Sequence, residues 1–250
     1  GSLFNDHKGN KSTAIGHNTL AIQDFTTSTD TFNTAVGFQA GNAVTTGVRQ
    51  TLIGGLAGDA LTTGDNNTAV GYNSLSAMTV GDRNVAVGVG TLASANVTSN
   101  ADTYNTAVGF DAGNDITTGT SNTLIGGLAG DAITTASNNT AVGYASLGTN
   151  TTGAGNVAVG RESLFNNTTA SNNTAVGLNS LYTNTTGINN VAVGKDALIA
   201  STTANNNTAV GYDCLQANTT GASNASVGKS ALEANTTGSA NAAFGADALG

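Results

Sequence analysis

Apolar and polar positions recur along this chain with a period of seventeen, which is the interval from Gly54 to Gly71. A glycine anchors each copy, as in the segments NNTAVGYNSL at 66–75 and NNTAVGYASL at 138–147. Eleven of the thirteen intervals between successive anchors have this length, and the other two are longer by four. A short repeat that fills the chain predicts an array of small stacked units. The fourteen anchors are Gly16, Gly37, Gly54, Gly71, Gly88, Gly109, Gly126, Gly143, Gly160, Gly177, Gly194, Gly211, Gly228 and Gly245.

The residues directly before each anchor glycine have the pattern of a β-strand. Val142 precedes Gly143, Thr140 stands two residues earlier, and the small Ala141 lies between them. Alternation of this kind with β-branched residues predicts a strand, whereas a glycine in every unit disfavours a helix. We expect the threonine and valine positions to face the interior and the alanine position to face outward.

The rest of each unit predicts a closed coil. A leucine such as Leu147 follows most anchor glycines by four residues, and we place it inside, facing the valine. We expect the glycine to form a corner before a second short strand, and segments such as Thr-Thr-Gly at 151–153 to form a turn. Because so short a strand cannot bury a face alone, the next copy must stack on it at about 4.7–4.9 Å. The sequence therefore predicts an all-β parallel β-solenoid with one coil per repeat and about 14 coils.

The repeat also sets the expected domain organisation. We expect residues 1–11 to hold a cloning remnant and a partial repeat, and residues 12–250 to form a single solenoid domain. The segment at 33–64 returns with few changes at 105–136, which indicates that a block of four units was duplicated. Because the last unit is incomplete, we expect the chain to be a fragment of a longer protein.

An asparagine stands four residues before the anchor glycine in twelve of the fourteen units. Stacked amides can hydrogen-bond along a solenoid, so we interpret this row as a structural ladder rather than as a row that binds a ligand or ice. A second asparagine row, which begins at Asn150, occurs only in the C-terminal half, and we interpret it as a change in packing on a neighbouring chain. The central ladder residues are Asn67, Asn84, Asn105, Asn122, Asn139, Asn156, Asn173, Asn190 and Asn207.

Composition excludes several classes of function. Only 9% of the residues are charged, and the net charge of -8 disfavours a nucleic-acid partner, which needs clustered cations. The chain has no long apolar run, so we expect no membrane insertion of this fragment.

The reactive side chains also indicate no enzyme. His7 and His17 are the only histidines, and Cys214 is the only cysteine, so we expect no metal site and no cofactor. We interpret Cys214 as a small buried residue. Asp196 and Asp213 fall on successive coils at a separation that would suit a retaining glycosidase, but no aromatic sugar platform accompanies them. We therefore interpret the pair as a solvated corner.

The two longer intervals are the candidates for recognition. They correspond to expanded loops at 21–32 and 93–104, which leave the coil at equivalent places. Each loop ends with an aspartate two residues before an aromatic residue, namely Asp30 with Phe32 and Asp102 with Tyr104. The alternative interpretation is that both loops are tolerated surface insertions.

Over residues 12–249, the recurring NTAVG, NVAVG and STAIG strands, each followed by a small residue and a leucine, resemble the head repeats of YadA-like trimeric autotransporter adhesins. The NTTG linkers resemble repeat arrays of phage tail fibres that carry an endosialidase-type chaperone domain. The resemblance implies a left-handed β-roll with three chains about one axis, located outside the cell, at a cell surface or on a virion. The strand alanines that we expect to face outward, such as Ala141, would form an apolar stripe along the coils. We expect a homotrimer that associates through this alanine stripe.

The expected function is a structural or adhesive rod that forms or presents a receptor-binding surface for a host-surface glycan or protein. Ice binding by threonine and asparagine rows is an alternative, which the expected inward direction of Thr34 and Thr68 disfavours. A fragment of a polysaccharide-degrading tail spike is a second alternative.

Overall fold

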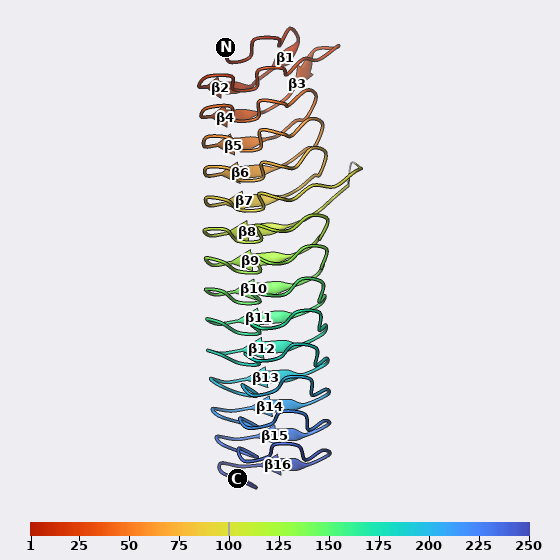
Figure 1. The fold of residues 1–250 in the computed structure, drawn as a ribbon. Coiled ribbons are helices and arrows are strands. Elements are labelled where there is room, and N and C mark those ends of the chain that lie inside the picture. Colours follow the sequence, from red (N-terminus) through yellow and green to blue (C-terminus); the bar gives the residue numbers. More distant parts are fainter. Residues whose placement is uncertain (100) are drawn as a thin grey trace. The chain divides into compact units, whose positions relative to one another are not determined.

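The computed structural model describes residues 1–99 and 101–250. The fold is an all-β parallel β-solenoid of about 14 coils, as the sequence predicted (Figure 1). Each turn has the predicted period of about seventeen, which is the sequence separation of the bonded residues Asn156 and Asn173 on successive coils. None of the described residues lies in a helix. The chain divides into two compact units, residues 1–122 and 123–250.

Each coil contributes one strand of three residues to the long parallel sheet, and the shorter β1 and β3 pair separately. In the first unit the strands are β1 (Gly9–Asn10), β2 (Thr13–Ile15), β3 (Thr29–Asp30), β4 (Thr34–Val36), β5 (Thr51–Ile53), β6 (Thr68–Val70), β7 (Val85–Val87) and β8 (Thr106–Val108). In the second unit they are β9 (Thr123–Ile125), β10 (Thr140–Val142), β11 (Val157–Val159), β12 (Thr174–Val176), β13 (Val191–Val193), β14 (Thr208–Val210), β15 (Ala225–Val227) and β16 (Ala242–Phe244).

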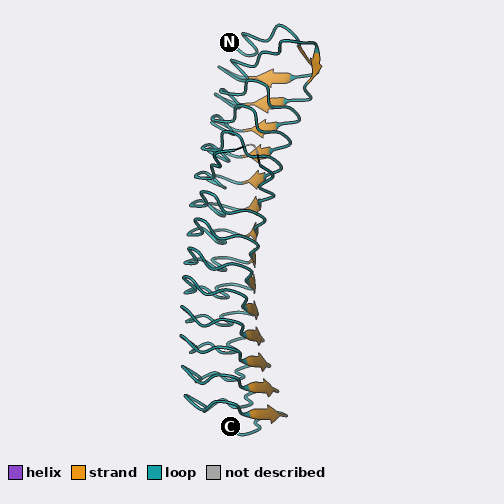
Figure 2. Cartoon of the chain, turned by 90° about the vertical axis from the view of Figure 1, so that its right-hand side faces the viewer, coloured by secondary structure: helices purple, strands orange, loops and turns teal. Residues whose placement is uncertain are grey.

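Equivalent residues of neighbouring coils pair with each other. Between β10 and β11, for example, Ala141 pairs with Ala158 and Val142 pairs with Val159 in a parallel ladder. Within each of the two units, Figure 2 shows the strands along one side and the turns along the other. The predicted stacking of one coil on the next is confirmed.

The predicted direction of the strand side chains was wrong. The middle residue of the strand, such as Ala141 or Ala175, is completely buried, whereas Val142 and Thr140 on either side are only partly buried and face outward. Leu147 is completely buried, as expected. The leucine therefore packs on the alanine side of the strand, and no alanine stripe is exposed in the described coils.

The coil interior is narrow, which explains why alanine faces inward. Where the middle strand residue is a leucine, as at Leu52 and Leu124, the usual inward leucine four residues after the anchor is a glycine. A Cβ added to Gly58 or Gly130 would lie 2.8 Å from Leu52 or Leu124 respectively. In these two coils the strand leucine thus takes the space that the turn leucine fills in most other coils.

The second short strand predicted after the glycine does not form, because those residues are turns in the described coils. Leu147 itself has a φ of 57° and Ala145 a φ of 51°, both in the left-handed region. These two left-handed residues curl the chain back so that the leucine enters the interior.

The anchor glycine forms the predicted corner. Gly143 has a φ of 137°, and a Cβ on this residue would lie 2.6 Å from the carbonyl oxygen of Gly160 on the next coil. The backbone of the next coil cannot move away without breaking the stacking. The positive φ and this clash therefore both exclude a side chain at Gly143.

Replacing Gly143 with alanine should lower the free energy of unfolding by several kcal/mol, about the sum of a strained φ and a backbone clash. Gly245→Ala is the matched control, because Gly245 has a similar φ of 124° but no atom within 4 Å of an added Cβ. Urea unfolding of both variants would measure the difference. An equal decrease in the free energy of unfolding of both variants would contradict the requirement for glycine through close stacking.

Candidate functional site

The asparagine row forms a buried ladder that joins side chains to the backbone of the next coil. The Oδ1 of Asn156 accepts a hydrogen bond from the backbone N–H of Asn173 at 3.0 Å, and Asn173 repeats this contact to Asn190 at 2.9 Å. The Nδ2 of Asn173 donates across the coil to the carbonyl of Gly187 at 2.8 Å. The first unit uses the same contacts, including that from the Asn84 N–H to Asn67 Oδ1 at 3.0 Å. Each amide thus fixes its own turn and the register of its neighbour.

The second asparagine row is also internal. Asn150 is completely buried, its Nδ2 donates to the Gly153 carbonyl at 2.9 Å, and its Oδ1 accepts from Asn167 Nδ2 at 2.8 Å. Equivalent positions in the first unit hold buried apolar residues such as Leu61 and Met78. The interpretation of this row as packing on a neighbouring chain was therefore wrong, since the side chains point into their own coil.

The second ladder has a gap at Ser201. This serine occupies the position of Asn184 on the next coil, where the other coils of the row have asparagine. Its Oγ and the Oδ1 of Asn184 are both buried without a hydrogen-bond partner. A serine side chain is too short to span the distance between coils, which leaves both groups unsatisfied.

Ser201→Asn should therefore stabilise the protein, because the new amide would donate to Asn184 Oδ1 and complete the row. Each unsatisfied buried group costs about 1–3 kcal/mol, and the gain should fall in that range. Ser201→Ala is the control, since it removes the serine hydroxyl but leaves Asn184 Oδ1 unpaired and should gain less. Calorimetric melting compares the variants, and a Ser201→Asn protein no more stable than Ser201→Ala would contradict the ladder geometry.

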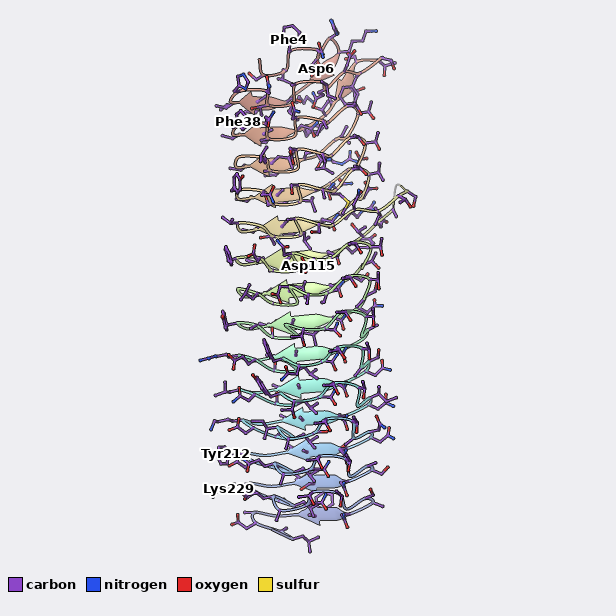
Figure 3. The ribbon with its side chains drawn as sticks, viewed as in Figure 1. Phe4, Asp6, Phe38, Asp115, Tyr212 and Lys229 are labelled. Atoms are coloured by element: carbon purple, nitrogen blue, oxygen red, sulfur yellow. The ribbon has the colours of Figure 1, made fainter. Side chains whose placement is uncertain are left out.

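Each unit has a regular surface that we name the outer strand face. It consists of the first and third residues of strands β2 and β4–β8 in the first unit and of β9–β16 in the second. These residues are threonine, valine or isoleucine in nearly every coil, and none is charged. Ile53 remains 39% exposed and Ile125 41% exposed. The residue after the anchor glycine borders this surface. It is an exposed aromatic residue in several coils, such as Phe38, and an exposed cation in others, such as Lys229, and Figure 3 labels both at the side where the strands end.

The expanded loops bring their predicted residues together with cations that sequence reasoning missed. Lys11 Nζ lies 2.7 Å from Asp30 Oδ2 and 5.0 Å from the ring centroid of Phe32. In the second loop Arg83 forms an ion pair with Asp102, and its Cζ lies 5.7 Å from the ring centroid of Tyr104. Residue 100, within the predicted loop 93–104, lies outside the described residues. The equal spacing of Lys11 and Arg83 before their loops was the available signal.

Among the remaining reactive side chains, Lys195 Nζ lies 5.1 Å from the ring centroid of Tyr212 on the next coil. Lys195 Nζ lies 2.9 Å from Asp196 Oδ2, and this hydrogen bond raises the pKa of Lys195. Cys214 is buried, as expected, and its burial raises the pKa of the thiol. In the described part of the chain there is no group of three or more His, Cys, Asp or Glu side chains that could hold a metal ion.

Burial also raises the pKa of the Asp59 carboxyl, whose Oδ1 is buried without a partner. Backbone N–H groups of Asp59 and Ala60 donate to the carboxyl and act in the opposite direction, but burial has the larger effect on the pKa.

Comparisons with known proteins leave the family open: no family model matches the chain, and no curated protein or solved structure matches it. Within the described ranges, no helix is long and apolar enough to span a membrane.

Proposed function

We propose that this chain is a structural and adhesive module that associates with copies of itself through the outer strand face. The observation that carries the proposal is the composition of that face, which presents β-branched side chains on successive coils without a charged residue. Proteins that keep a sheet surface in water usually protect it with charges, and a continuous uncharged surface is typical of an interface.

The small, uniform side chains of this face also suit close packing. Rows of threonine and valine are flat enough for two sheets to pack about 10 Å apart. The resemblance of the repeats to trimeric adhesin heads supports three copies and a left-handed roll. In this proposal the outer strand face, rather than an alanine stripe, forms the trimer interface of an extracellular or virion appendage.

Ice binding is the second candidate, because the structure removes the main argument against it. Thr34 and Thr68 lie on the outer strand face, where they could order water, rather than inside the coil. Valine interrupts this threonine row at Val85 in the first unit and at Val157 and Val191 in the second. Because the threonine row is interrupted, the face is better suited to packing against another protein surface than to matching the regular spacing of an ice lattice.

Sedimentation of the purified chain should give three times its mass of 24.4 kDa at micromolar concentration. The double variant Val142→Lys and Val176→Lys places charges on the outer strand face and should shift the protein to monomer with an unchanged circular dichroism spectrum. The control Thr152→Lys and Thr186→Lys adds the same charges on exposed turns of the same unit and should remain trimeric.

A monomeric wild-type protein would contradict the proposal. If that monomer also produced thermal hysteresis, the ice-binding candidate would replace it.

A further inference from the structure

The two expanded loops build the same arrangement twice within the first unit. We name them the Phe32 corner (Lys11, Asp30 and Phe32) and the Tyr104 corner (Arg83, Asp102 and Tyr104). In each corner a cation from one coil pairs with the aspartate of the next and lies against its aromatic ring. In Figure 1 the segment that leads into β3 and the described part of the segment from β7 to β8 extend beyond neighbouring coils on the same side.

Short backbone contacts hold both corners in place. In the Phe32 corner β3 pairs with β1, and the Thr31 hydroxyl donates to the Asn10 carbonyl at 2.8 Å. In the Tyr104 corner Asp102 forms a bridge with Asp82, and the Thr103 hydroxyl lies 2.8 Å from the Asp82 carbonyl. The side chains are therefore preorganised rather than carried on free loops.

Neither packing nor backbone conformation accounts for the aromatic residues. Phe32 and Tyr104 are each 53% exposed, so the rings are not core residues. Their φ angles of 52° and 50° lie in the left-handed region, which costs a bulky residue about 1–2 kcal/mol. Asn66 and Ser121 occupy the same position in other coils of this unit with φ angles of 60° and 58°.

The aromatic ring is also unnecessary for the cation contact between coils. Arg49 reaches the next coil in the same way, with its Nε donating to Asn66 Oδ1 at 2.6 Å and its NH2 group 3.7 Å from Asp65. An asparagine thus serves where the two corners have a ring. The two rings add an exposed planar surface beside the cation, and the Tyr104 hydroxyl also donates to Asp102 Oδ2 at 2.9 Å.

We infer that the Phe32 and Tyr104 corners bind neutral glycans, which would be the receptor class of the adhesive function proposed above. A pyranose has an apolar face that can lie on an aromatic ring and hydroxyl groups that bond to the adjacent carboxylate and cation. Each corner pairs one positive with one negative side chain, and the chain has a net charge of -8, so a neutral sugar suits these corners better than an anionic one.

The two corners should act together on one polysaccharide. They precede β4 and β8, four coils apart, which corresponds to about 19 Å at the spacing of stacked strands. When a long glycan binds one corner, its local concentration at the other corner rises. Two weak contacts then give a measurable overall affinity.

Electrophoresis in native gels that contain mannan, dextran or galactan tests this inference on the whole chain. The wild-type protein should be retarded in at least one of these gels. Phe32→Ala or Tyr104→Ala should each weaken the retardation about tenfold or more by removing bivalency, and the double variant should abolish it. Asn66→Ala is the matched control, because it alters the equivalent position without a ring and should migrate as the wild type does.

No retardation by any neutral polysaccharide, equal retardation of the double variant, or retardation only in a heparin gel would overturn the inference. The inference rests on the proposed function, and sedimentation of the same samples separates the two. A trimer without glycan retardation contradicts the glycan corners alone, whereas a monomer contradicts the proposed association whatever the gels show.

Discussion

The fold depends on keeping equivalent atoms of successive coils in register. Each strand of the long sheet is only three residues long, so its backbone hydrogen bonds alone allow slippage by one residue, which would exchange the inward and outward side chains. The buried asparagine removes this freedom, because its Oδ1 reaches the backbone N–H of the next asparagine and its Nδ2 closes its own coil. The anchor glycine lets the backbones approach closely enough for that contact. Near-identical repeats follow from this geometry.

The same constraint separates the roles of the two strand surfaces. The coil interior is narrow, and a leucine in the middle of the strand occurs with a glycine in the turn, as with Leu52 and Gly58. The outer strand face is free of that constraint, yet it keeps uncharged β-branched residues in nearly every coil. Retention of such residues where the coil does not need them is the reason for proposing an interface there. In the expanded loops, coil stacking does not require the exposed aromatic rings of Phe32 and Tyr104.

Much of the fold followed from the sequence, because period, anchor glycine and asparagine row are all visible without coordinates. The inward and outward directions of the strand side chains were predicted the wrong way round, since alternation identifies two faces but does not say which is inside. The occurrence of Leu124 together with Gly130 carried that information. A glycine in the turn makes room for a leucine in the middle of the strand only if both positions face the coil interior. Left-handed residues such as Leu147 were also missed, since tertiary packing overrides the local preference of leucine. In the candidate corners the sequence predicted Asp102 and Tyr104, but Arg83 lies in the preceding coil and only the stacking brings it to them.

Residue-resolved amide hydrogen exchange tests the register ladder most directly. The backbone N–H groups of Asn173, Asn190 and Asn207 donate to side-chain oxygens rather than to a strand partner, and the account predicts that they are protected within about tenfold of the strand amides of Thr174, Val191 and Thr208. Exchange of these asparagine amides at the rate of an unstructured peptide, while the strand amides remain protected, would contradict it.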